Sequence, residues 1–241
     1  AEDLRAENLA KRFGTEHWRS GYSRRAARSL VWCRRHPRKD GFRMMRSRFP
    51  IRIRARHAVA AALVGCGQLD AAHAELEQLD GSAADAGVDW ADGNQHLTAI
   101  SASRAELTIA SGDIDTGLAH YFAALRHSDW PTTGTMPGPF GALVASACVA
   151  AHALAGRADA ANQVANELGT IAVQRLRQFP DMPQLGCVAG ALGIHRIVTG
   201  RDTRAGMRFL ALAHRLRARQ DLPSLRLAGY DEAARAILGD D

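Results

Sequence analysis

Ten histidines and four cysteines are the side chains of this 241-residue chain that could bind a metal or act as a nucleophile. A metal site needs several such ligands at short, regular spacing. His120 and His127 share a predicted helix but lie seven residues apart with no carboxylate between them, and no histidine belongs to an H-E-x-x-H sequence. The sequence therefore predicts no metal site and no cofactor.

The four cysteines are far apart and lie in apolar stretches predicted to be helical: Cys33, Cys66, Cys148 and Cys187. Without C-x-x-C spacing, we expect buried, reduced thiols in a cytoplasmic protein.

Walker A, G-x-G-x-x-G and G-x-S-x-G sequences are also missing from the chain. We find no acid–base pair or nucleophile arrangement and predict that the protein is not an enzyme. The alternative is an enzyme on a helical scaffold, which a deep polar pocket with perturbed carboxylates would favour.

Positive charge is concentrated at the N-terminal end. Residues 1–56 carry 17 Lys/Arg against 5 Asp/Glu, whereas residues 57–241 carry 14 against 20. The arginines of the segment 24–56 are interleaved with aromatic residues, a pattern suited to DNA or RNA phosphates. The candidate contacts are Arg28, Arg35 and Arg52. The alternatives are a solvated face, or a surface that docks an acidic domain or another subunit, because no known nucleic-acid-binding motif is present.

A short step repeated at near-constant intervals indicates how these side chains are positioned. Its glycines lie at positions 21, 67, 112, 156 and 200, which are 46, 45, 44 and 44 residues apart. Each glycine is predicted to end one helix in a left-handed conformation, which carries no Cβ penalty. Two further positions recur: a helix cap three residues later (Asp70, Asp115, Asp159, Thr203), and a small residue five residues later (Ala72, Gly117, Ala161, Ala205).

The period predicts an all-α solenoid of about five helical hairpins with a C-terminal capping helix that starts at Pro223. Residues 1–49 are predicted to form a basic N-terminal helical repeat, continuous with a TPR-like array over residues 50–241. The helices are predicted over residues 51–66, 70–79, 95–111, 115–127, 140–155, 159–168, 170–178, 184–199 and 203–219. No run of apolar residues is long enough to span a membrane. The start Ala1-Glu2 shows neither a signal peptide nor an initiator Met, which predicts a processed chain or a fragment.

The step Gly-x-x-Asp-x-Ala, with small residues on either side, resembles the tetratricopeptide (TPR) hairpin. Equivalent positions are Ala60, Gly67, Ala72 and Leu79, although the period of 44–46 exceeds the 34 residues of that family. The resemblance implies that the first helix of each hairpin lines a concave groove. His152 and Arg196, each four residues before a glycine, would then face a bound peptide or small anion. The alternative is that both make local hydrogen bonds between neighbouring repeats.

The segments 179–193 and 209–221 resemble the last repeats of actinobacterial transcriptional regulators of the AfsR/SARP type. The 29 arginines against 2 lysines suit a high-GC genome. This resemblance implies the interaction or sensing end of a regulator, which recognises a protein, a peptide or a small effector. The alternative is a nucleic-acid-associated adaptor that uses the basic segment 24–56. Assembly into a homo-oligomer is left open.

The small residue of the step gives the first testable prediction. Replacing Ala161 by Leu should wedge its hairpin apart and lower the free energy of unfolding by about 1–3 kcal/mol. Denaturant unfolding of the variant measures this loss. An unchanged stability would mean that position 161 does not lie at the contact between the two helices.

Overall fold

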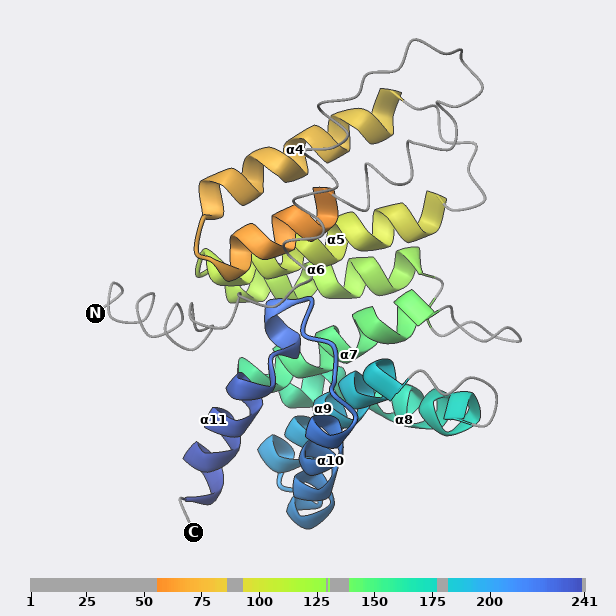
Figure 1. The fold of residues 1–241 in the computed structure, drawn as a ribbon, viewed down its shortest axis with the longest axis vertical. Helices are drawn as coiled ribbons and strands as arrows, with labels where there is room; N and C mark the ends of the chain where they lie inside the picture. Colours follow the sequence, from red (N-terminus) through yellow and green to blue (C-terminus); the bar gives the residue numbers. More distant parts are fainter. Residues whose placement is uncertain (1–55, 86–92, 129, 131–138, 177–181, 240–241) are drawn as a thin grey trace.

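A computed structural model describes residues 56–85, 93–128, 130, 139–176 and 182–239 (Figure 1). Over these residues the protein is all-α, with nine α-helices and two short 3-10 helices. The predicted repeat at Gly21, the boundary at residue 49 and the candidates Arg28, Arg35 and Arg52 all lie outside the described residues. None of the helices described is long and apolar enough to cross a membrane.

The helices follow one another as antiparallel pairs joined by short turns. A helix over residues 56–65 packs with α4 (Leu69–Asp85) around Val64 and Leu76. The next pairs are α5 (Gly93–Ala110) with α6 (Ile114–His127), α7 (Pro139–Leu154) with η1 (Ala158–Ala161) and α8 (Asn162–Leu176), and α9 (Met182–Thr199) with α10 (Thr203–Arg215). After them come η2 (Pro223–Leu225) and α11 (Leu227–Leu238). Neighbouring pairs contact each other through α6 and α7 and through α7 and α9 (Figure 1).

The predicted left-handed glycines are confirmed in every described copy of the step. Gly67, Gly112, Gly156 and Gly200 have φ between +65° and +97°. In the first three copies, the residue after the glycine donates its N–H to the carbonyl five residues earlier, as Arg157 does to His152 at 2.8 Å. This arrangement satisfies carbonyls that the helix end leaves free, and it reverses the chain within a few residues.

The predicted helix caps at Asp115 and Thr203 are wrong. Asp113 caps α6 by accepting a hydrogen bond from the Thr116 N–H at 3.2 Å. Asp202 caps α10 by accepting one from the Ala205 N–H at 2.9 Å. The cap comes one or two residues after the glycine, directly before the first residue of each helix, Ile114 or Thr203.

The carboxylates three residues after the glycine have another partner. Arg157 reaches Asp115 at 3.7 Å, and Arg201 reaches Asp159 at 3.6 Å. In both contacts an arginine just after one glycine meets the aspartate of the preceding copy, so the turns of successive pairs lie side by side. These side chains are exposed, and such ion pairs contribute little to stability. The two ion pairs do show that successive helix pairs are related in the same way, because equivalent residues meet in both.

Close approach of the two helices is confirmed at Gly117. A methyl group there would lie 2.5 Å from Ile109 Cγ1 and 2.9 Å from the Ala105 carbonyl oxygen. In the last pair, the close contact falls on Gly206 and not on the predicted Ala205. A methyl group on Gly206 would lie 2.9 Å from the backbone oxygen of Gly193, because the two glycines face each other.

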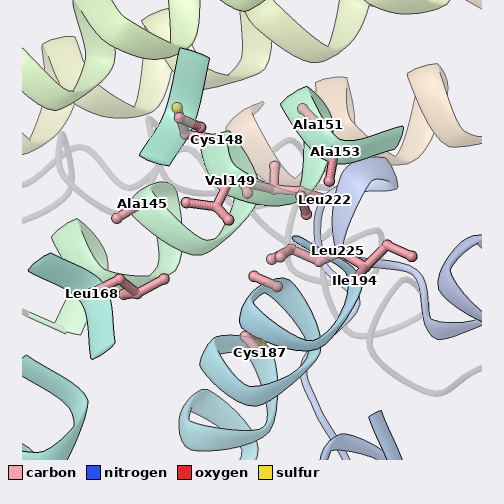
Figure 2. Packing of buried hydrophobic residues seen from close by; sticks show 14 of the residues in the cluster. Ala145, Cys148, Val149, Ala151, Ala153, Leu168, Cys187, Ile194, Leu222 and Leu225 are labelled. Carbon is pink, nitrogen blue, oxygen red and sulfur yellow. The ribbon is translucent and has the colours of Figure 1, made fainter. Parts of the chain in front are cut away.

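Helix α7 is the centre of the hydrophobic core. Every residue from 141 to 153 is buried, so the helix is apolar on all sides, as expected for a helix enclosed by others. Figure 2 shows Ala145 and Val149 of α7 near Leu168 of α8, with Ile194 of α9 and Leu225 of η2 on another side. The C-terminal segment therefore completes the core and does more than cap one end of it.

Several predicted helix boundaries differ from the observed ones. The helices predicted over 159–168 and 170–178 are η1 followed by one helix, α8, which continues through Gly169. Helix α10 ends at Arg215 rather than near 219, because Arg217 takes a left-handed conformation with φ of 53°. Pro223 begins η2, and α11 starts four residues later.

Replacing Gly117 by Ala should lower the free energy of unfolding by about 1–3 kcal/mol, because the added methyl meets backbone atoms that cannot yield. The matched control is Gly169→Ala within α8, where the nearest atom is Leu192 Cδ1 at 3.8 Å. There the better helix propensity of alanine should stabilise by up to about 1 kcal/mol. Denaturant unfolding that showed equal effects at both positions would contradict close packing at Gly117.

Candidate functional site

The most concentrated polar arrangement in the described part of the chain surrounds Glu106 of α5. Its side chain lies in the core, and its residue is 2% exposed. Glu106 Oε1 accepts hydrogen bonds from the Tyr121 hydroxyl of α6 and from both the N–H, at 3.1 Å, and the hydroxyl of Ser224. Three donors on one carboxylate oxygen bring together residues that are 118 positions apart in the chain.

Further contacts of the C-terminal segment extend this network. The Tyr121 hydroxyl lies 2.9 Å from Ser224 Oγ, and the Tyr230 hydroxyl donates to the Ser224 carbonyl at 2.9 Å. Arg226 donates to the carbonyl oxygen of Gly65 at 3.4 Å. The segment from Leu222 to Tyr230 therefore lies against α5, α6 and the end of the helix 56–65. No sequence motif announces this arrangement, because its members are single residues on distant elements.

The electrostatics of Glu106 are dominated by burial. Burial raises the pKa of Glu106, while the hydrogen bonds from Ser224 and Tyr121 and the charge of Arg226 act in the opposite direction. Burial also raises the pKa of Tyr121 well above the usual range of a tyrosine, and the adjacent Glu106 adds to this. The carboxyl is enclosed by protein, so a substrate does not reach it in this conformation. The arrangement holds the fold together.

His152, predicted to line a groove, lies in the core. Its residue is 2% exposed, its Nδ1 donates to the Cys148 carbonyl oxygen at 2.8 Å, and its ring lies 4.8 Å from that of Phe122. Burial raises the pKa of the neighbouring Cys148 thiol to about 12, so this Cys–His pair holds no reactive thiolate. Binding of a ligand by His152 would require the core to open.

Arg196, the second predicted groove residue, is partly exposed but already has partners. Its Nη1 atom lies 3.7 Å from the Asp202 carboxylate, and its guanidinium lies 5.1 Å from the centre of the Phe209 ring. These local contacts are made within the pair α9–α10, whereas His152 faces α6. The two predicted residues therefore do not converge on one site.

The cysteines follow the prediction in part. Cys148 and Cys187 are buried, as expected, but Cys66 is exposed at the turn before Gly67, and for this residue the prediction is wrong. Cys33 lies outside the described residues. No group of three or more His, Cys, Asp or Glu side chains among the residues described could hold a metal ion.

A histidine pair joins the first two helix pairs. The rings of His57 and His96 lie 5.6 Å apart in an edge-to-face arrangement, and His57 Nδ1 lies 3.3 Å from Ser103 Oγ. Burial, together with the neighbouring His96, lowers the pKa of His57 to about 4. Burial also lowers the pKa of His96, so both rings are neutral at physiological pH. Among the described residues, the pair is a packing contact in which Ser103 is the polar partner of His57.

The outer face of α10 carries a cluster of arginines that sequence analysis missed. Arg204, Arg208 and Arg215 fall within an arc of about 40° on the helix, and all three are exposed. They make no ion pair with any described residue. The signal is present in the sequence, since residues 203–219 contain five arginines and no acidic residue.

No protein-family model, curated protein or solved structure matches this chain.

Glu106 makes a specific pH dependence testable. Because its folded-state pKa lies above the ordinary 4.5, the folded protein holds a proton that the unfolded chain releases. The contribution of Glu106 to the free energy of unfolding should therefore fall as pH rises from about 4.5 through the raised pKa. Buried His57, whose pKa is lowered to about 4, contributes a slope of opposite sign over part of the same range. Glu106→Gln keeps an acceptor oxygen but does not titrate, so the free energy of unfolding of the variant should lack the negative contribution and rise more steeply with pH than that of the wild type.

Urea unfolding at a series of pH values measures this slope. The control is Glu77→Gln on the exposed face of α4, which should follow the wild-type curve. If Glu106→Gln showed the same pH dependence as the wild type, the pKa of Glu106 would not be raised in the folded protein.

Proposed function

We propose that this chain is a non-catalytic interaction module, built as a TPR-like solenoid of helical hairpins. The finer architecture is supported by the constant 44–46-residue spacing of the glycines and by their positive φ. The equivalent ion pairs Arg157–Asp115 and Arg201–Asp159 support it as well, because they imply the same step from each pair to the next. In solenoids of this kind, the extended surface is what binds partners.

The observation that carries the proposal is the arginine face of α10. The three exposed arginines have no acidic partner among the described residues, so their positive charge is available to a ligand. Arginine is a preferred residue for carboxylate and phosphate recognition. The polar residues suited to catalysis are used differently. Glu106 and His152 are buried and hydrogen bonded within the core, where they stabilise the fold.

A place in a transcriptional regulator is the second part of the proposal. It rests on the resemblance of segments 179–193 and 209–221 to the last repeats of AfsR/SARP-type regulators. The second of these segments includes the C-terminal half of α10 and Arg215. In such a regulator the chain would bind a protein or peptide, and it would leave DNA and nucleotide binding to other domains.

A nucleic-acid-associated adaptor is the competing function, because the same arginines suit phosphates. In that case, Arg204, Arg208 and Arg215 would supplement the basic segment 24–56. The two functions differ in salt dependence: contacts to nucleic-acid phosphates release counterions, so affinity falls steeply as salt rises.

Replacing Arg204, Arg208 and Arg215 by Glu should weaken binding of the native partner at least about tenfold, roughly 1.4 kcal/mol. The partner is captured from the native cell extract, purified and titrated against wild-type and variant chains. Arg126→Glu, an exposed arginine of α6, is the control and should leave binding unchanged. Binding of duplex DNA with a steep salt dependence, lost in the triple variant, would instead support the adaptor function.

A further inference from the structure

Helix α10 can be compared with α6, because both are the second helix of a pair and both carry a glycine at the closest approach to the first. With Gly117 and Gly206 aligned, positions 118, 122 and 125 of α6 correspond to 207, 211 and 214 of α10. Leu118 and Leu125 are 5% and 4% exposed. The corresponding Met207 is 46% exposed, and Ala211 and His214 are exposed too.

The following helix pair accounts for the burial in α6. Helix α7 packs on α6, and its His152 lies against Phe122. Among the described residues, α10 has no such following pair. Helix α11 contacts α10 at His214, whose Nε2 lies 3.1 Å from Asp231 Oδ1. The side of α10 that a further helix would cover is thus left open around Met207 and Ala211.

The open side of α10 borders the arginine face. Arg204 corresponds to Asp115 of α6, and Arg208 corresponds to Ala119. Arg215 corresponds to Arg126, so the change from α6 to α10 replaces an acidic and a neutral position with positive charge. An apolar strip beside a basic strip therefore distinguishes α10 from α6.

We propose that an acidic amphipathic helix of a partner protein stacks on α10, in the manner of a following helix. Its apolar side covers Met207 and Ala211, and its carboxylates reach Arg204, Arg208 and Arg215. This inference rests on the proposed interaction function and names the class of partner.

The combination of charges and apolar side chains favours a protein helix over other polyanions. Phosphates would contact the arginines but would leave Met207, which is 46% exposed, uncovered. The arginines extend over about 16 Å of helix axis, from Arg204 to Arg215. A partner helix of about three turns with carboxylates along one edge matches this length, which is the usual form of helix recognition on a surface.

The probe is a fluorescently labelled synthetic helix of about 20 residues, with leucines on one side and glutamates along the adjacent edge. The control peptide has the same composition in a scrambled order that is not amphipathic. Fluorescence anisotropy with the full chain should show binding of the first peptide only. Binding should weaken at least about tenfold in R204E/R208E/R215E and be unchanged in Arg126→Glu, the matched position on α6.

Met207→Ser tests the apolar half of the site without changing its charge. It should weaken peptide binding by about fivefold, as expected for the loss of buried apolar area. Melting temperatures verify that each variant is folded, and Arg208→Gln serves if the triple variant is not. An unchanged affinity in Met207→Ser would overturn the stacked geometry.

The remaining outcomes separate this inference from the proposed function. If the captured native partner binds through the arginines but the amphipathic peptide does not bind, the inference is overturned and the interaction function stands. If the peptide binds equally to the triple variant, the inference is also overturned. Binding of duplex DNA or of phosphatidylglycerol vesicles in preference to the peptide would overturn it in favour of a different anionic partner.

Discussion

A carboxyl group in the core must obtain all its hydrogen bonds from the protein, and much of this structure follows from how Glu106 does so. Its donors are Tyr121, from the partner helix of the same pair, and Ser224, from the C-terminal segment. Ser224 can donate only if the chain returns from the end of α10 to the α5–α6 pair. That return places η2 against α7 and sets α11 across α9 and one end of α10. What α11 covers, and what it leaves open, is therefore a consequence of one buried acid.

The sequence predicted well those features that depend on neighbouring residues. The left-handed glycines and the helix pairs they separate were predictable, because a helix end is a local event. Cap positions were off by one or two residues, since Asp113 and Asp202 compete successfully with the aspartate and threonine that recur in the repeated step. The partnership of Glu106 with Ser224 could not be predicted, because no periodicity relates residues 118 positions apart. Burial of His152 was missed for a similar reason, since it depends on α7 being enclosed on every side.

Equivalent positions in successive helix pairs serve as internal controls for function. Where the repeated steps carry the same residue, as at the turn glycines, the backbone conformation at that position explains the residue. Where α10 departs from α6, the backbone gives no reason for the change, and an arginine in place of Asp115 or Ala119 points outward from the fold. His152 and Arg196 were chosen from the sequence by the same logic, but each has a satisfied local contact. A residue that differs between equivalent positions therefore indicates a functional site only if its side chain is also exposed and has no partner among the described residues.

The contact between Glu106 and Ser224 also has a consequence for folding during synthesis. During synthesis, Glu106 and Tyr121 leave the ribosome long before Ser224 exists. At a translation rate of about 5–20 residues per second, the interval is on the order of ten seconds. Throughout it, the carboxyl lacks two of its donors and α7 lacks the segment that covers one of its sides. The nascent chain must therefore wait in a partly hydrated form, with a hydrophobic helix exposed, until the segment around Ser224 has been added.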